Sequence, residues 1–322
     1  MISKKAISLL FISLVIISCN DYKRGLKKME NEDYEGAEKD FTLEIEKNPE
    51  NIDAYRERAS VRFKLNEYKK AIEDYKIVLK YVPNDTTVLS DMGTANYNLG
   101  NYYEAISSLS KAIRLDSTFY KDFQLRGNSK YNLEDLDGAR EDLNMAYKLL
   151  EELDVFEEKK GDIYYVLGAV ELKLKNYKKA IEYMNTAVEF YNSSNVSRLA
   201  LKYFSSQANT YFYLAYAQRK LNQDSAAMVN YSKSIEINGS NSSAYNNRGL
   251  IKRDNKDLYG AIDDFTNAIE NENDSTSLGI YYNNRGVTKE KLGDKEGGCD
   301  DWSKGKSYKN SRAASNYRIK CN

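Results

Sequence analysis

The chain has 322 residues, of which 30% are charged, and its 48 lysines and arginines balance its 48 aspartates and glutamates. This balance argues against a nucleic-acid partner, because binding to a phosphate backbone needs an excess of basic side chains. The sequence contains no histidine, which excludes imidazole bases, imidazole metal ligands and nucleophiles activated by histidine. We therefore expect no catalytic residues, no metal site and no cofactor.

The first 18 residues have the pattern of a secretory signal peptide. Lys4 and Lys5 precede a twelve-residue apolar run over residues 6–17, which is too short to span a bilayer as a mature helix. The run leads into Ile16-Ile17-Ser18-Cys19, which resembles the bacterial lipoprotein box. The resemblance implies cleavage before Cys19, acylation of its sulfur and new amino group, and stable attachment to a membrane. The alternative is an ordinary secretory peptide with a chance cysteine.

The residues after Cys19 indicate which membrane surface carries the protein. Asn20 is not the aspartate that resembles an inner-membrane retention signal in enterobacterial lipoproteins, so we expect the outer membrane. Asp21 stands outside any acidic run of the kind that marks surface export in some bacteria, which favours the periplasmic face over the cell surface. The first helix is predicted to begin within a few residues of Cys19, so the start of the folded chain should lie close to the lipid headgroups.

From residue 25 onward the chain repeats with a period of 34 residues. Alanine or glycine returns at eight anchor positions, which are Ala37, Ala71, Ala105, Ala139, Ala180, Ala227, Ala261 and Gly298. Slots are numbered here from the anchor. Slot −12 holds only small residues, namely Gly25, Ala59, Gly93, Gly127, Gly168, Ala215, Gly249 and Gly286. Slot +4 holds large apolar ones, namely Phe41, Tyr75, Leu109, Leu143, Met184, Tyr231, Phe265 and Trp302. Glycine within a helix costs about 1 kcal/mol relative to alanine, so its recurrence implies close helix packing.

Both prolines, Pro49 and Pro83, lie twelve residues after an anchor, where a second helix must end. Together with the slots above, this pattern resembles the tetratricopeptide repeat family over roughly residues 20–310. The resemblance implies an all-α fold, a right-handed α-solenoid of about eight helical hairpins with a concave binding surface. We expect a signal peptide over 1–18 and a single solenoid over 19–322, with repeats at about 19–51, 52–85, 86–119, 120–160, 161–207, 208–241, 242–278 and 279–308 and a capping helix over 309–322.

Two spacings exceed the 34-residue period by seven residues or more. The anchors Ala139 and Ala180 are 41 residues apart, and a helical stripe continues after the first of them to an expected stop at Gly161. The anchors Ala180 and Ala227 are 47 residues apart, which predicts a longer loop and a helix extended backwards.

Two further slots covary. Arginine occupies slot −13 in the same five repeats in which aspartate occupies slot +3, and positions that vary together usually touch. The predicted pairs are Arg24 with Asp40, Arg58 with Asp74, Arg126 with Asp142, Arg248 with Asp264 and Arg285 with Asp301. Each pair would join the two helices of one repeat, with a partly exposed pair contributing about 0.2 to 1 kcal/mol.

The resemblance also implies a binding groove on the first helix of each repeat, at slots −15, −11 and −8. The residues chosen there are Phe63, Tyr97, Asn128, Tyr131, Tyr165, Phe212, Tyr216, Arg219, Asn246, Arg253 and Asn283. Aromatic and arginine side chains dominate protein interfaces, and asparagine can pair with an extended backbone. For any single aromatic residue, packing between adjacent repeats is the alternative. In some members of the family, lysine and asparagine bind chaperone carboxy-termini, but Asn128 is matched with Gln124 here.

These observations favour a non-enzymatic, lipid-anchored scaffold that binds envelope proteins or peptides in its groove. The alternative is a lipoprotein that binds glycan or peptidoglycan, in which the same aromatic and amide side chains would contact sugars. No nucleotide is expected, because Asp300 stands where the phosphate-loop motif that would end in Gly305-Lys306-Ser307 needs a glycine.

The carboxy-terminus contains the two cysteines that remain once Cys19 is acylated. Cys299 and Cys321 can form a disulfide in an oxidising compartment, where it would clamp the weak capping segment over the last repeat. The alternative is two buried thiols. The run from Gly298 to Trp302 and the terminal Ile319-Lys320-Cys321 also resemble a recurrent ending of such repeat proteins in Bacteroidetes-type bacteria.

Overall fold

The computed structural model describes residues 21–152, 157–193 and 201–321. The chain divides into two compact units, unit 1 (Met1–Asp154) and unit 2 (Val155–Asn322). The predicted signal peptide and Cys19 lie outside the described residues. So does the junction at residues 153–156, on which the prediction of one continuous solenoid depends.

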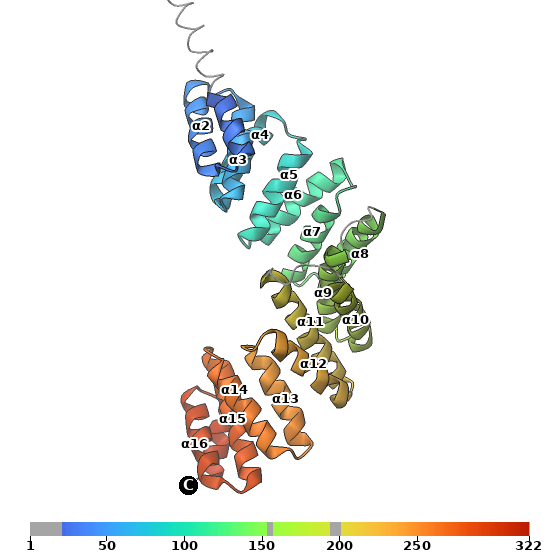
Figure 1. The fold of residues 1–322 in the computed structure, drawn as a ribbon, viewed down its shortest axis with the longest axis vertical. Helices are drawn as coiled ribbons and strands as arrows, with labels where there is room; N and C mark the ends of the chain where they lie inside the picture. Colours follow the sequence, from blue (N-terminus) through green and yellow to red (C-terminus); the bar gives the residue numbers. More distant parts are fainter. Residues whose placement is uncertain (1–20, 153–156, 194–200, 322) are drawn as a thin grey trace, which may run out of the picture. The chain divides into compact units, whose positions relative to one another are not determined.

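The described residues of unit 1 form four helical hairpins, which follow one another along the chain (Figure 1). In hairpin 1 a helix that includes residues 21–30 packs against α2 (Tyr34–Lys47). Hairpins 2 to 4 pair α3 (Ile52–Lys64) with α4 (Tyr68–Tyr81), α5 (Thr86–Asn98) with α6 (Tyr102–Leu115), and α7 (Tyr120–Asn132) with α8 (Leu136–Glu152). Within this unit, α2, α4 and α6 each also pack against the first helix of the next hairpin.

Unit 2 contains hairpins 5 to 8 and a final single helix. The pairs are α9 (Glu157–Lys173) with α10 (Tyr177–Ser193), α11 (Leu201–Lys220) with α12 (Asp224–Ile237), α13 (Ser242–Asp254) with α14 (Leu258–Glu270), and α15 (Ser275–Leu292) with α16 (Lys295–Ser307). The helix α17 (Ser311–Lys320) packs against α16 and α15. The all-α prediction is confirmed: the described residues form paired helices and no strand.

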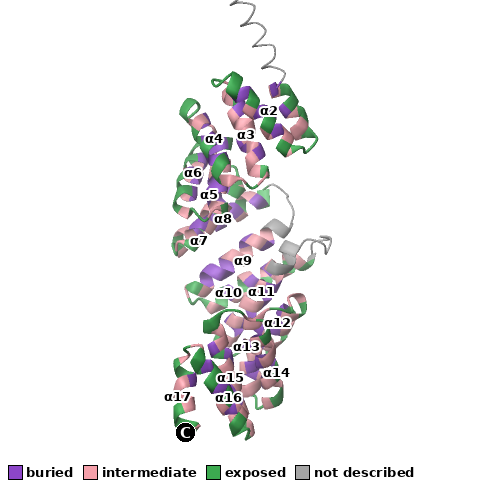
Figure 2. Ribbon diagram, turned by 90° about the vertical axis from the view of Figure 1, so that its left-hand side faces the viewer, coloured by how far each residue is buried: buried purple, intermediate pink, exposed green. Residues whose placement is uncertain are grey.

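The core of each hairpin comes from the three slots that the period identified. All the anchor alanines and the large side chains at slot +4 are buried, and buried residues line the faces where helices meet (Figure 2). A Cβ on Gly93 would lie 2.6 Å from Leu109 Cγ, and one on Gly168 would lie 2.7 Å from Met184 Cε. Slot −12 therefore has to be small, because the slot +4 side chain of the same hairpin fills the space beside it.

The turn inside every hairpin places a left-handed residue at slot −5. These residues are Glu32, Asn66, Gly100, Glu134, Lys175, Asn222, Lys256 and Gly293, with φ between 59° and 97°. In four hairpins the next residue is an aspartate that caps the second helix by accepting a hydrogen bond from a glycine N–H three residues on. A Cβ on that glycine would lie 2.1–2.3 Å from the aspartate, so cap and glycine occur together.

The predicted boundaries differ from the structure where the spacing is irregular. The expected helix stop at Gly161 is wrong, because α8 ends at Glu152 and Gly161 lies buried inside α9. Its Cβ would stand 3.0 Å from the Tyr191 ring, so this glycine serves helix packing. The helix α11 begins at Leu201, ahead of the predicted repeat boundary at 208, which agrees with the expected backward extension of this helix. The helix α15 begins at Ser275, four residues before the predicted boundary at 279. None of the helices in the described part combines the length and apolar character of a membrane span.

Candidate functional site

In unit 1 the predicted binding surface consists of Phe63, Tyr97, Asn128 and Tyr131, on α3, α5 and α7. All four side chains are partly exposed. The Phe63 ring lies edge-on against Tyr68, with centroids 5.3 Å apart, and the Tyr97 ring is tilted against Tyr102 at 5.8 Å. These contacts hold the rings at slot −8 against the turns of their own hairpins, so the rings are ordered without being buried.

The polar groups beside this row have identifiable roles. Burial raises the pKa of the Tyr97 phenol, and a hydrogen bond with Asn128 opposes that rise. The Oδ1 atom of Asn128 is buried and has no hydrogen-bond partner within the described structure. A buried carbonyl oxygen without a donor is a local cost in free energy.

Three carboxyl groups lie on the first helices of unit 1. Burial raises the pKa values of Glu57, Asp91 and Asp122 above their usual range. The Tyr75 hydroxyl donates to Asp91 at 3.3 Å, and the Ser90 hydroxyl donates to Asp122 at 2.6 Å. These bonds join neighbouring hairpins. In the part of the chain that the structure describes, no three cysteine, aspartate or glutamate side chains are grouped to hold a metal ion.

In unit 2 two predicted groove residues are buried, which corrects the prediction. Asn246 and Asn283 are 8% and 7% exposed. Asn284 donates to Asn246 Oδ1 at 2.8 Å, and Asn316 donates to Asn283 Oδ1 at 3.1 Å. Slot −15 faces the next first helix at these positions. The two amides therefore join hairpin 7 to hairpin 8 and hairpin 8 to α17.

The aromatic residues predicted in unit 2 are partly exposed and partly used in packing. Phe212 packs against the core of its hairpin and lies 5.8 Å from the Tyr231 ring. The Tyr165 ring lies 6.1 Å from Tyr213. The Tyr216 ring is partly exposed and has the Lys220 ammonium 5.1 Å from its centre. Of these three aromatic residues, Phe212 and Tyr165 pack against other rings, whereas the Tyr216 ring contacts a lysine.

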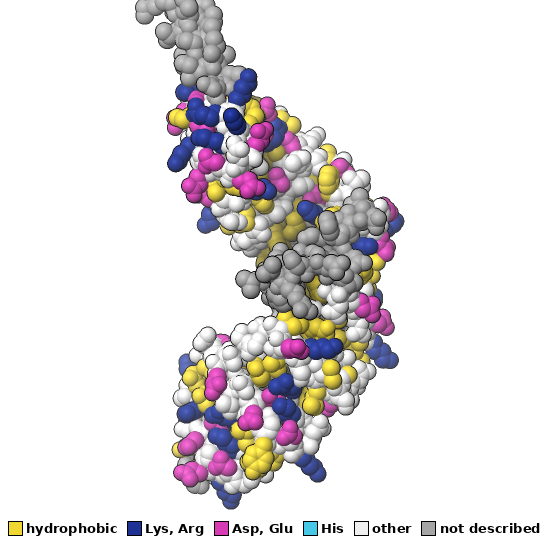
Figure 3. Space-filling model, viewed as in Figure 1, with side chains coloured by type: hydrophobic (Ala, Val, Ile, Leu, Met, Phe, Trp, Pro, Cys, Tyr) yellow, Lys and Arg dark blue, Asp and Glu magenta, His cyan; other side chains and the backbone are white. Residues whose placement is uncertain are grey.

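The two predicted arginines of unit 2, Arg219 and Arg253, both contact residues of hairpin 7. Arg219 donates to the Asn247 carbonyl at 2.8 Å and pairs with Asp254 at 3.2 Å. Arg253 also pairs with Asp254, at 3.3 Å. One carboxylate thus faces two guanidinium groups, which leaves a net positive charge at this point of the surface. On the face drawn in Figure 3, basic and acidic side chains are interspersed.

The structure contains all five predicted arginine–aspartate pairs. In each, the arginine Nε donates to the aspartate Oδ2 at 2.8–2.9 Å, and Nη2 donates to Oδ1 of the same carboxylate. This bidentate geometry fixes orientation as well as distance. The aspartates are buried, so the pairs are less exposed than the sequence analysis assumed.

Two sets of further partners of these pairs were not predicted from the sequence. A second cation at slot −9 lies 2.8–3.1 Å from each aspartate; these are Lys28, Arg62, Lys130, Lys252 and Lys289. Four of the arginines also donate to a hydroxyl at slot +5 of the preceding hairpin at 3.0–3.2 Å; these are Thr42, Ser110, Ser232 and Thr266. The sequence contained a signal for these hydroxyl partners. Three hairpins lack the arginine at slot −13 and carry Met92, Leu167 or Leu214 there. In the hairpin before each of them, slot +5 holds lysine or asparagine instead of serine or threonine.

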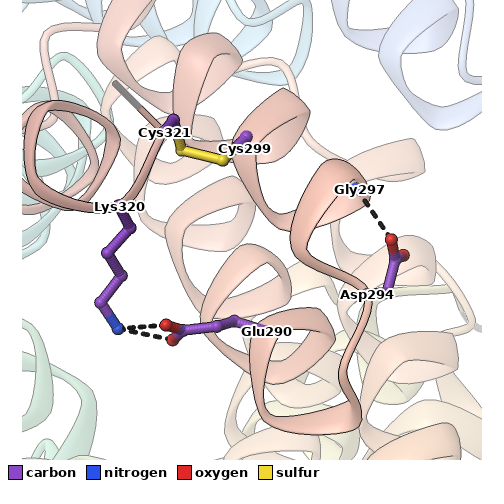
Figure 4. The surroundings of a disulfide bond; sticks show 6 residues. All are labelled: Glu290, Asp294, Gly297, Cys299, Lys320 and Cys321. Carbon is purple, nitrogen blue, oxygen red and sulfur yellow. Dashed lines mark hydrogen bonds and ion pairs between the residues drawn. A yellow bond between two sulfur atoms is a disulfide. The ribbon is translucent and has the colours of Figure 1, made fainter.

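At the carboxy-terminus Cys299 and Cys321 are joined by a disulfide, with Cα atoms 5.7 Å apart (Figure 4). Lys320 forms an ion pair with Glu290 of α15, also drawn in Figure 4. Ala313, the buried residue of α17, fits against Gly305, where a Cβ would lie 2.7 Å away. The disulfide therefore fastens α17 over hairpin 8, as the sequence analysis expected of a cap.

Comparison with known proteins agrees with the hairpin geometry. Profiles of the tetratricopeptide repeat match residues 22–86, 57–118 and 161–193. The chain therefore contains tetratricopeptide repeats in both units, with hairpins of the same construction on either side of the matched ranges. No functionally curated protein matches the sequence at a significant level.

Solved structures share the fold at low sequence identity. A tetratricopeptide repeat protein from Parabacteroides merdae is 17% identical, with 84% of this chain and 99% of that one covered and a TM-score of 0.52. The APC/C hetero-tetramer Cut9–Hcn1 is 13% identical, with 90% and 53% covered and a TM-score of 0.57. At these identities the likeness concerns the fold alone.

Proposed function

We propose that the protein is a non-enzymatic scaffold that binds protein or peptide partners on the first helices of its hairpins. The observation that carries this proposal is the aromatic row at Phe63, Tyr97 and Tyr131. In the same three hairpins the anchor alanines are completely buried, whereas slot −8 keeps a ring partly exposed each time. Phe63 also packs against the core of its hairpin, but a ring that stays partly exposed at one slot in three consecutive hairpins offers a surface that the core does not use up.

The row has the properties of a protein-binding surface. Partly exposed aromatic rings supply large contact areas, and rings already held by neighbours lose little conformational entropy on binding. Asn128 lies beside Tyr97 and adds a partly exposed amide side chain to the row. In unit 2, Tyr216 and the cationic pair Arg219 and Arg253 offer a second surface of different chemistry.

We further propose that acyl groups on Cys19 hold the scaffold in a bacterial cell envelope, at the periplasmic face of the outer membrane. The signal-peptide pattern and the lipoprotein-like box support this placement. The disulfide between Cys299 and Cys321 supports it independently, because structural disulfides persist in compartments outside the reducing cytosol.

Affinity capture from native membranes tests the binding surface. We expect a stoichiometric protein partner that is lost with Tyr97→Ala or Tyr131→Ala. The matched control is Tyr103→Ala, since Tyr103 is 74% exposed but lies on α6, outside the first-helix face. Tyr216→Ala examines unit 2 separately.

A partner retained by all these variants would contradict the proposal. Captured sugar without any protein, together with muropeptide binding that Tyr97→Ala abolishes, would favour the glycan-binding alternative instead.

A further inference from the structure

Exposed apolar side chains gather along one edge of unit 1. Tyr81 and Val82, where α4 ends, are 59% and 41% exposed, Leu115 at the end of α6 is 46% exposed, and Phe119 just before α7 is 55% exposed. All four lie in, or directly beside, the two connections that lead from hairpin 2 to hairpin 3 and from hairpin 3 to hairpin 4. Connections usually expose polar residues, and clustered apolar exposure on a folded surface marks an interaction site.

The opposite edge of unit 1 exposes mostly polar residues, with one strongly exposed aromatic side chain, Tyr103 near the start of α6. There each hairpin turns from its first to its second helix, and the left-handed residues Glu32, Asn66, Gly100 and Glu134 are exposed. The leucine in such a turn folds inward: Leu65, for example, packs against the core of hairpin 1. A connection between helices therefore need not expose apolar side chains. The two edges of unit 1 differ in how many such side chains they expose.

The chain enters unit 1 on the apolar edge. Asp21 is buried at the start of the first helix and forms an ion pair with Lys47, the last residue of α2. Lys47 stands where hairpin 1 connects to hairpin 2, so the beginning of the described chain lies in line with the connections that carry Tyr81 and Phe119.

Two further contacts extend this line across unit 1. Arg56, in the early part of α3, pairs with Asp85, the N-cap residue of α5, at 2.8 Å. Ser90, in the early part of α5, donates to Asp122, in the first turn of α7, at 2.6 Å. The starts of successive first helices thus lie side by side, and they form one continuous edge.

We propose that this edge of unit 1 rests on the membrane, with Tyr81, Val82, Leu115 and Phe119 inserted at the level of the lipid headgroups. The inference rests on the proposed acylation of Cys19. Cys19 precedes Asp21 by two residues, and two residues span at most about 7 Å. Acyl chains on Cys19 therefore bring the edge within reach of the bilayer surface.

The composition of the edge suits a lipid interface. Tyrosine is enriched at the headgroup level of membranes, and inserted apolar side chains strengthen the binding that acyl chains provide. The exposed cations Lys80, Arg114 and Lys121 flank the patch, and Lys80 lies 5.9 Å from the centre of the Tyr81 ring. Long cationic side chains of this kind can place their charge among headgroups while their stems cover apolar surface.

This orientation leaves the binding surface of unit 1 accessible. The first helices begin at the membrane edge and run away from it, and slot −8 lies near their far ends. Phe63, for example, is the last residue but one of α3. The aromatic row then faces the aqueous compartment at a distance from the lipid.

Fluorescence quenching by brominated lipid tests the inference. The acylated full-length protein is reconstituted in phosphatidylcholine vesicles with bromine near the headgroup end of the acyl chains. Trp302, the only tryptophan, is replaced by Phe, the residue found at the same slot in hairpins 1 and 7. A single tryptophan is then introduced as Phe119→Trp or, as the matched control at the opposite edge, as Tyr103→Trp.

We expect brominated lipid to remove most of the emission of the Phe119→Trp protein and to leave the Tyr103→Trp emission unchanged. Equal quenching of the two, or none at Phe119→Trp, in protein that floats with the vesicles would overturn the membrane-edge proposal while leaving the anchor intact. Protein that does not float, and whose mass shows no acyl group on Cys19, would overturn the anchor itself and the edge proposal with it. A circular dichroism spectrum like that of the unsubstituted protein establishes that both variants fold.

Discussion

The ion pair between Arg126 and Asp142 allows a quantitative test of how the hairpins are held together. We consider Arg126→Met, Asp142→Ser and the two changes combined. Hairpin 3 naturally carries Met92 and Ser108 at these slots, so the double variant copies a combination that the chain already uses. The single variants create combinations found in none of its eight hairpins.

The geometry sets the magnitudes. Arg126 binds Asp142 through two hydrogen bonds of 2.8 and 2.6 Å, and the carboxylate is 6% exposed. Breaking a buried pair by removing one partner costs about 3–5 kcal/mol. Lys130 stays 2.9 Å from Asp142 after Arg126→Met, so we expect a smaller loss for that variant, about 2 kcal/mol. Asp142→Ser should cost a similar amount, because Arg126 and Lys130 lose their shared carboxylate.

The double variant should lose about 2 kcal/mol instead of the sum of the single losses, which corresponds to a coupling free energy of about 2 kcal/mol. Urea unfolding followed by circular dichroism gives the three free-energy changes, and hydrogen exchange in α7 and α8 localises them. Lys70→Met is the control, because its pair with Glu67 is mostly exposed and should contribute too little to measure. Additive losses from the two single variants would refute the reasoning.

Three further predictions follow from the packing, the titration and the cap. Gly93→Ala should lower the melting temperature, because a Cβ 2.6 Å from the buried Leu109 Cγ costs about 1–3 kcal/mol by overpacking, more than the helix-propensity gain of about 1 kcal/mol; a higher melting temperature would contradict this. Burial raises the pKa of Glu57, so the free energy of unfolding that this side chain contributes decreases as the pH rises through the raised pKa. Glu57→Gln should therefore raise the free energy of unfolding at neutral pH and give no gain well below the ordinary glutamate pKa of about 4.3, where the carboxyl is protonated in both states; equal effects at both pH values would count against it. Replacing Cys299 and Cys321 together by serine should cost about 3 kcal/mol in the chain-entropy account and speed hydrogen exchange in α17, whereas unchanged exchange there would show that the disulfide does not hold the cap.

The packing of the hairpins could be predicted from the sequence because each core slot is a steric requirement repeated eight times. A small residue at slot −12, such as Gly93, is required because slot +4 of the same hairpin holds a large one, such as Leu109. A requirement repeated in every hairpin can be recognised from the sequence alone. The pairing of Arg126 with Asp142 was visible for the same reason, since a charge without its partner is costly in every repeat where it occurs.

The contacts between hairpins were harder to predict, because the period compares residues within a repeat and not across its borders. Asn246 was assigned to the groove, but its slot also faces the following first helix, and Asn284 there supplies a partner. The hydrogen bond from Arg126 to the Ser110 hydroxyl was not predicted, because the two residues belong to different hairpins. A glycine after a helical stripe predicts a helix stop at Gly161, but this glycine allows close packing against Tyr191 inside α9.

The central claim is that a partner protein occupies the first-helix face of the hairpins, and site-specific photo-crosslinking in living cells tests it most directly. A photoreactive phenylalanine derivative introduced at Tyr131 should yield one discrete protein adduct, and the same group at Tyr103 should yield none. An adduct of equal yield at both sites, or no adduct at Tyr131, Tyr97 and Tyr216, would contradict the claim.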